Sequence, residues 1–321
     1  MERINSNLFL EKNVNQVTRL SNFKLRFFIN YVLSILCSFY VFFKGGWGMY
    51  FHWYIVKKAT IAFFKKRMSL VELNEIAIAP LDSFRYFEFH FGYAFIKDLD
   101  IDSYLDISSP RYFPAYLIEK KKLQNAVLIN PDKKDIANTN ELYQKLGLGG
   151  NAVLINELIE NVELQPESFD LITSISVLEH IPLEYILNCI EQILNLLKPG
   201  GHLLISIPVA KKSFEEYINY NEYGLQDKTN DGYYFGQRFH DSQLIDELFI
   251  STLGQPLKIK IVGEKINGFF INNRFEKLNY INYPSRAESL IFNKNYAIYD
   301  TIDSLPGLGV AIFLFQKRVK S

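Results

Sequence analysis

Residues 169–181 read FDLITSISVLEHI, and residues 196–208 read LLKPGGHLLISIP. Each block contains a short apolar run, and the segment between the blocks has the apolar spacing of a helix. A strand, a helix, a Gly-Gly turn and a second apolar strand form the repeating unit of a parallel sheet. We therefore predict strands at 169–175 and 202–207, joined by a helix over 183–197.

The same alternation continues on both sides of this unit. It predicts strands at 104–107, 126–129, 152–155, 258–262 and 310–316, with helices at about 110–121 and 138–146. Alternating strands and helices indicate a doubly wound α/β domain. Such sheets bind ligands beyond the carboxyl ends of their strands, so the strand-end loops are where we expect a site.

The composition fits a globular protein. The chain has 321 residues, of which 48% are hydrophobic and 22% charged, and this excludes a disordered chain. Cys37 and Cys189 are the only cysteines and show no metal-ligand spacing, which favours a reducing compartment and predicts neither a disulfide framework nor a metal site. The net charge of zero gives no indication of nucleic acid binding.

The charge is unevenly distributed along the chain. Residues 1–67 hold eleven basic and two acidic residues, a net charge of +9, and the remainder carries −9. We expect three parts: a basic, aromatic helical extension over 1–67, a linking helix within 68–97 that covers the ligand cleft, and the α/β domain over 98–321. Insertions are expected at about 209–238 and 265–306.

The extension contains an apolar run at residues 25–43, followed by aromatic residues and then by lysines. On a helix, its polar residues form one narrow stripe: Arg26, Asn30, Ser34 and Ser38. Apolar residues, aromatic rings and then cations follow the order of layers at a membrane surface. One interpretation is a helix that spans or lies on an anionic membrane through residues 25–67, with the rest of the chain in the cytoplasm. The other is a soluble helical cap packed on the α/β domain.

The two quoted blocks resemble the fourth and fifth strand regions of class I S-adenosylmethionine-dependent methyltransferases of the type 11 kind. The family pattern is FDxI, LEHI, a helix and then LLKPGG, and about forty continuous residues match it. The resemblance implies a Rossmann-like sheet of seven strands in the order 3-2-1-4-5-7-6, with the seventh antiparallel. It also implies S-adenosylmethionine as the cofactor.

The glycine-rich first motif of this family is degenerate in the chain. Asp106 holds the acidic position at the end of the first strand, whereas Ser108 and Pro110 replace glycines. Ser108 and Pro110 lack the freedom of glycine at positive φ, so we expect a different turn here. Ser109 as an N-cap and Pro110 in the first helical position would still present backbone N–H groups to an anion.

The resemblance also places cofactor-binding candidates after the other strands. Asn130 and Asp132 follow the second strand, where the family holds the ribose hydroxyls, and Glu157 follows the third, near the adenine. Ser176 and Glu179 follow the fourth strand, at the methionine end. A solvated loop carboxylate explains Glu157 equally well.

His180 and His240 are the candidate catalytic residues. His180 belongs to the LEHI motif, and His240 follows the aromatic insertion that would roof an acceptor pocket. A packed ring bonded to backbone is the alternative for His180, and a surface histidine beside an N-cap is the alternative for His240. Arg85 and Glu88, three apart on a predicted helix face, fit an ordinary ion pair.

Two functions follow from the sequence. The first is a methyltransferase that acts at the cytosolic membrane surface on an unidentified small-molecule, lipid-linked or glycan acceptor. The second is a methyltransferase fold that no longer binds cofactor and serves as a binding or scaffold protein. Ser108, Pro110 and Asn130 favour the second function, and the LEHI and KPGG regions favour the first.

Overall fold

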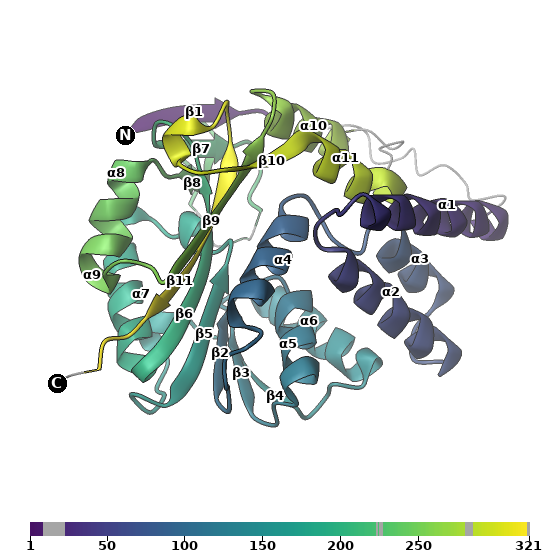
Figure 1. The fold of residues 1–321 in the computed structure, drawn as a ribbon, viewed down its shortest axis with the longest axis horizontal. Helices are drawn as coiled ribbons and strands as arrows, with labels where there is room; N and C mark the ends of the chain where they lie inside the picture. The colour runs from purple at the N-terminus through teal and green to yellow at the C-terminus, as the bar shows by residue number, and fades with distance from the viewer. Residues whose placement is uncertain (9–22, 223, 225–226, 280–284, 320–321) are drawn as a thin grey trace.

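The computed structural model describes residues 1–8, 23–222, 224, 227–279 and 285–319. Within these residues, the main element is an eight-stranded sheet in the order β10-β9-β11-β6-β5-β2-β3-β4 (Figure 1). Its strands are β2 (Tyr104–Ile107), β3 (Ala126–Ile129), β4 (Ala152–Ile155), β5 (Phe169–Ile175), β6 (Leu197–Val209), β9 (Lys258–Glu264), β10 (Tyr296–Tyr299) and β11 (Gly309–Gln316).

The strand directions confirm the expected topology. The strands from β4 to β6 are parallel, and β11 runs antiparallel to both β6 and β9. Without β10, the order is the 3-2-1-4-5-7-6 arrangement, and the fold is Rossmann-like. The strand count of seven was wrong, because β10 adds an antiparallel edge strand to β9. It forms within the Asn- and Tyr-rich insertion, where no apolar alternation marked a strand.

Helices cover both faces of the sheet, and each face has its own apolar core. On one side lie α4 (Arg85–Ile96), α5 (Tyr112–Lys121) and α6 (Lys133–Leu146) (Figure 1). On the other lie α7 (Leu183–Leu196), α8 (Ser242–Ile245), the π-helical turn η3 (Asp246–Ile250) and α9 (Ser251–Leu253). The buried residues of α7 recur every three or four positions, which is why this segment is a helix on the sheet.

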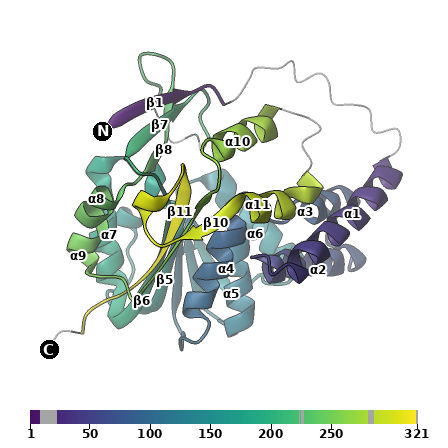
Figure 2. The same cartoon turned by 45° about the horizontal axis from the view of Figure 1, so that its top comes forward.

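The N-terminus and the first insertion form a second, small sheet. Strand β1 (Glu2–Ser6) pairs in parallel with β7 (Phe214–Ile218), which pairs antiparallel with β8 (Tyr234–Phe239) (Figure 2). Arg3 forms an ion pair with Asp231, and its guanidinium lies 4.0 Å from the ring centre of Tyr217. The first residues of the extension are therefore part of the same unit as the insertion.

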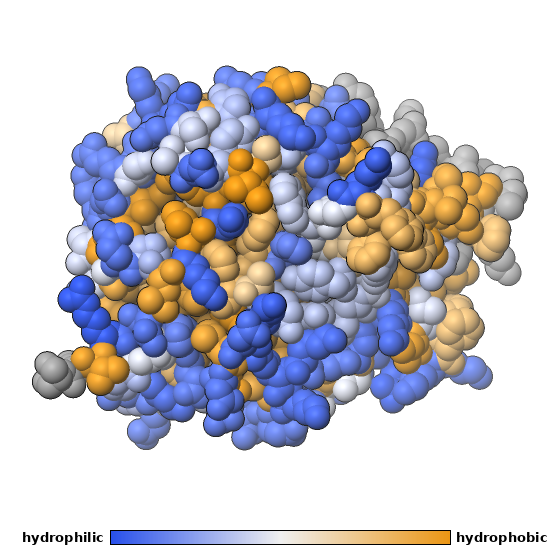
Figure 3. Space-filling model, viewed as in Figure 1, coloured by the Kyte–Doolittle hydropathy of each residue, from blue (hydrophilic) through white to orange (hydrophobic). Residues whose placement is uncertain are grey.

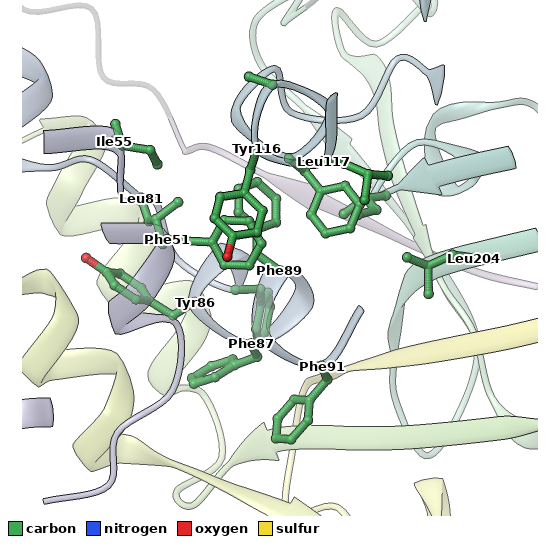
Figure 4. Close-up of a cluster of buried hydrophobic side chains, with 14 of the residues drawn as sticks. Phe51, Ile55, Leu81, Tyr86, Phe87, Phe89, Phe91, Tyr116, Leu117 and Leu204 are labelled. Carbon is green, nitrogen blue, oxygen red and sulfur yellow. The ribbon is translucent and has the colours of Figure 1, made fainter. Parts of the chain in front are cut away.

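Three helices follow in the N-terminal part: α1 (Phe23–Phe43), α2 (Met49–Phe64) and α3 (Leu70–Ile78). Helix α2 is built into the core of the α/β domain, since Phe51 contacts the rings of Phe89, Phe113 and Tyr116 (Figure 4). Trp47, just before α2, packs on Phe87 and Phe91.

Helix α1 turns its polar stripe toward the protein. Ser34 donates a hydrogen bond to the backbone oxygen of Ala77 in α3, and Ser38 accepts one from the Trp53 indole of α2. Both serines are buried, whereas the other side of α1 is apolar and exposed. Within the described residues, no helix is both long and apolar enough to cross a membrane.

The second insertion adds two helices over the edge of the main sheet, α10 (Phe269–Asn279) and α11 (Glu288–Asn295). Short 3-10 turns complete the described chain: η1 (Ile159–Asn161), η2 (Leu178–His180), η4 (Ser285–Ala287) and η5 (Ile302–Ser304). Of these, η2 contains the LEHI residues and follows β5 directly, so the motif lies at the carboxyl edge of the sheet.

Candidate functional site

The turn after β2 keeps a left-handed residue without glycine. Ser108 has φ 52°, in the region that a side chain enters at a cost of about 1–2 kcal/mol. Its backbone N–H donates to the Ile129 carbonyl at 2.8 Å, and its hydroxyl reaches the same oxygen at 3.2 Å. The expected loss of a positive φ did not occur at Ser108, because bonds to the neighbouring strand hold the serine in this conformation.

Asp106 and Ser109 fix this turn from inside. Asp106 is buried and accepts hydrogen bonds from Thr173 Oγ1 at 2.6 Å, from Tyr104 Oη and from the Ser109 N–H. Burial raises the pKa of Asp106 to about 6. The Ser109 hydroxyl accepts from the N–H of Ile175, at the end of β5. Both side chains thus hold β2 and β5 together at the strand ends.

Ser109 is not the N-cap of the next helix, as the sequence suggested. Helix α5 begins at Tyr112, two residues later than predicted, and the N-cap position falls on Arg111, which makes no side-chain capping bond. The reason is that the Ser109 hydroxyl is already used by Ile175.

The residues after β3 form a closed local network. Asn130 donates to Asp135 Oδ2 at 2.9 Å and accepts from the N–H of Asp132. Asp132 caps α6 by accepting from the N–H groups of Lys134 and Asp135, so the helix starts five residues before the predicted position. Arg111 forms an ion pair with Asp135. The residues that the resemblance assigns to the ribose hydroxyls therefore bind neighbouring groups of the same loop and helix start.

Glu157 lies in solvent after β4. Its carboxylate accepts from the N–H of Leu158 at 2.9 Å and from Asn161 Nδ2 at 3.3 Å. The neighbouring Asn156 donates to the backbone oxygens of Asn130 and Pro131 and so ties the two strand ends together. The exposed carboxylate keeps both interpretations of Glu157 open, as a local turn residue or as a group that faces a ligand.

Glu179 is the exceptional residue of the LEHI motif. Its side chain is 1% exposed, and neither carboxylate oxygen has a hydrogen-bond partner among the described residues. Burial raises the pKa of Glu179 to about 8, and the nearby Glu88 adds to the shift. Ser176, three residues earlier, has φ 54° and donates its N–H to Ser206 Oγ at 3.1 Å.

Helix α4 lies over these strand ends, where its Arg85 and Glu88 form the predicted ion pair. Glu88 is fully buried and also accepts from Ser206 Oγ at 2.8 Å, which attaches α4 to β6. Here the strand-end cluster means Arg85, Glu88, Ser176, Glu179 and Ser206. Sequence reasoning missed Ser206, although a serine inside an otherwise apolar strand run was the available signal.

Both candidate histidines are packed against backbone. His180 Nδ1 lies 2.5 Å from the Gly236 carbonyl, and its Nε2 lies 3.8 Å from Glu179. His240 is fully buried, with Nδ1 3.1 Å from the Pro208 carbonyl and its ring against Phe249. Burial lowers the pKa of each to about 4. The interpretation of His240 as a surface histidine was wrong, because β8 leads it directly into the core.

The insertions add buried charges that the sequence did not single out. Arg238 is fully buried and donates to Glu215 Oε1 at 3.0 Å. Glu216, at 1% exposure, accepts from Gln237 and from Arg274 of α10. Oppositely charged residues at facing positions of β7 and β8 were the only available signal, and the aromatic residues around them concealed it.

Residues 105–205 match a family model described as a methyltransferase domain. This segment of the chain is therefore similar to a type 11 methyltransferase domain. It contains the β2 turn, the β3 network and the LEHI residues, and it ends inside β6. The comparison with curated proteins found no match.

Solved structures that resemble this methyltransferase domain were found at low identity. The MccD protein has a TM-score of 0.49 at 10% identity, with 72% of this chain and 96% of that chain covered. A putative sarcosine dimethylglycine methyltransferase from Galdieria sulphuraria has 0.44 at 13%, with 68% and 80% covered. The 1,6-didemethyltoxoflavin-N1-methyltransferase of Burkholderia thailandensis has 0.44 at 13%, with 72% and 76% covered.

Proposed function

We propose that the chain is an S-adenosylmethionine-dependent methyltransferase acting on an unidentified acceptor. The observation that carries the proposal is the orphaned, buried Glu179 carboxylate at the end of β5, inside a segment that matches a methyltransferase domain. A buried carboxylate without a partner costs free energy unless a cation accompanies it. S-Adenosylmethionine has two cationic groups at its methionine end, the ammonium and the sulfonium.

The residues at the strand ends fit this cofactor. Glu179, beside the left-handed turn at Ser176, would hold the cationic end, and Arg85 of the strand-end cluster would face the methionine carboxylate. Asn130 would take a ribose hydroxyl once Asp135 releases its amide, and Glu157 has an exposed carboxylate for the adenine amino group. Asp106 and Ser109 would act indirectly, because they hold the turn that carries Ser108.

When bound, the cofactor supplies an electrophilic methyl group on sulfur. The group would supply the methyl carbon and its bond to sulfur, while Glu179 and Arg85 would hold its cationic and carboxylate ends. The protein's task is to align the acceptor with that bond, which depends on positioning more than on a strong base. His180 would support this by holding η2 against β8 through the Gly236 carbonyl. His240 holds the end of β8 against β6.

A second function is favoured by a specific observation. Asn130 and Asp132 are used within the loop, and the Arg111–Asp135 pair lies beside them. A fold that has lost cofactor binding and serves as a scaffold would tolerate such a network.

Calorimetry with S-adenosylmethionine and S-adenosylhomocysteine separates the two functions. We expect saturable binding that Glu179→Gln weakens by about tenfold or more, since a charge-assisted contact contributes about 1.5–3 kcal/mol. Glu163→Gln, in the loop after η1, is the control. Ser108→Gly restores the family's glycine and should preserve or tighten binding. No binding at millimolar cofactor would overturn the enzyme proposal and support the scaffold.

The acceptor class and the place of action belong to the same proposal. A small molecule, a lipid-linked intermediate or a glycan at the cytosolic membrane surface fits the apolar helix beside the domain. The charged residues Glu216, within the aromatic insertion, and Arg274 of α10 would face that acceptor. Incubating the protein with S-adenosylmethionine labelled in the methyl group and fractions of lipids, glycans and small metabolites tests the classes separately.

A further inference from the structure

Helix α1 buries polar side chains and exposes apolar ones, the opposite of a helix on the surface of a soluble protein. Ser34 and Ser38 are 2% and 0% exposed, whereas large apolar side chains occupy the outside. The exposed apolar residues of α1 are Phe28, Ile29, Val32, Leu33, Leu36, Phe39, Tyr40, Phe42 and Phe43. Most of them recur at spacings of three and four, so they share one face along the helix. We call this set the outer face of α1.

Helix α2 extends the outer face. Its Trp53 ring packs on Phe39 and Phe42 with centroid distances of 5.2 and 4.8 Å. On a helix, Lys57, Ile61 and Phe64 follow Trp53 at four, eight and eleven residues, so they continue its row. Ile61 is 40% exposed and Phe64 77% exposed, and Lys57 is exposed as well. Figure 3 shows apolar side chains gathered over α1 at the right of the molecule.

The segment of sequence that carries this surface has charges of one sign. Residues 12–71 contain ten basic residues and no Asp or Glu. Lys44 follows the end of α1, and Lys65 and Lys66 follow the end of α2, all of them exposed. A large apolar face on a segment whose own charges are all cationic matches the boundary between the acyl chains and headgroups of an anionic bilayer.

We propose that the outer face of α1, with the Trp53 row of α2, lies in the headgroup region of an anionic lipid bilayer. The buried serines fix which side of α1 meets the lipid, because Ser34 and Ser38 are bonded to α3 and α2. The helix therefore lies along the membrane plane with the α/β domain behind it. This inference specifies how the chain would contact the membrane surface named in the proposed function. If it fails, the methyl-transfer proposal still stands.

Vesicle flotation of the full chain tests the proposal. We expect recovery with vesicles of mixed phosphatidylglycerol and phosphatidylcholine, and little recovery with phosphatidylcholine alone. Reversing the charges of Lys65 and Lys66 to Glu should weaken binding by about tenfold or more, since each cation near an anionic surface contributes measurably. Leu36→Asp with Phe43→Asp should abolish flotation.

The matched control changes two exposed apolar residues elsewhere, Val153→Asp with Ile266→Asp. This variant should float like the unchanged protein, and circular dichroism should show that both double variants are folded. If the chain fails to float with anionic vesicles, the proposal is overturned. It is also overturned if sedimentation shows a stable dimer that only Leu36→Asp with Phe43→Asp dissociates, because a second copy then covers the outer face.

Discussion

Glu179 is the residue for which a change of pH has the clearest consequence. Its pKa is about 8 in the folded protein against an ordinary value of 4.5, so the folded state retains a proton that the unfolded chain has released. The free energy of unfolding should therefore fall as the pH rises from about 4.5 to 8. Glu179→Gln removes this dependence. Between pH 5 and pH 8, the free energy of unfolding of the variant should therefore rise by at least about 1 kcal/mol relative to that of the unchanged protein.

Urea unfolding followed at several pH values from 5 to 9 measures this effect. Glu157→Gln serves as the control, because that carboxylate lies in solvent and should leave the pH profile unchanged. Parallel profiles for Glu179→Gln and the unchanged protein would contradict the prediction.

At the residue scale, the sequence located the strand-end positions but not the partners of their side chains. Asp106 and Glu179 were identified from a motif, yet whether a carboxylate is bonded or orphaned depends on residues far away in the chain, such as Thr173 for Asp106. Likewise, Ser108 was expected to change the turn. A hydrogen bond to the Ile129 carbonyl of a neighbouring strand instead holds Ser108 at positive φ.

At the scale of the element, the reversed character of α1 leads to a paired prediction. Ser38→Leu makes the helix more apolar but overfills a buried site and removes the partner of the Trp53 indole. We expect it to lower the free energy of unfolding by about 1–3 kcal/mol. Leu36→Ser makes the helix more polar at a position that is 58% exposed, and should change stability by no more than about 0.5 kcal/mol.

Thermal unfolding of the two variants under one condition compares them directly. If Leu36→Ser loses more stability than Ser38→Leu, the assignment of Ser38 to the buried side of α1 and of Leu36 to the exposed side is contradicted.

The strands and helices of the main sheet were predictable where an apolar period was long, as in α7. The start of α6 was missed because Lys133 to Ala137 lack an apolar pattern, and the signal was the cap at Asp132. Strand β10 was missed because an edge strand of four residues carries little periodicity, and its pairing with β9 is decided by the sheet.

At the scale of the whole molecule, the first strand joins residues that lie more than 200 positions apart. Arg3 of β1 pairs with Asp231 and stacks on Tyr217. Arg3→Ala should therefore lower the opening free energy of β7 and speed its amide exchange, because the change removes an ion pair and a cation–π contact that join β1 to the insertion.

Hydrogen exchange with mass spectrometry resolves this change by segment. Phe214–Ile218 should exchange faster in Arg3→Ala, whereas Phe169–Ile175, in the middle of the main sheet, should be unaffected. If Phe214–Ile218 exchanges at the same rate in Arg3→Ala as in the unchanged protein, the prediction is contradicted.

The two tryptophans occupy contrasting surroundings, and this gives the protein an optical probe. Trp47 packs among the core rings Phe87 and Phe91, whereas Trp53 lies against Phe39 and Phe42 of α1. In a Trp47→Phe variant, the remaining indole emission comes from beside the outer face of α1. Quenching by iodide from water, or by brominated lipid from within a bilayer, then reports the surroundings of this helix without any added label.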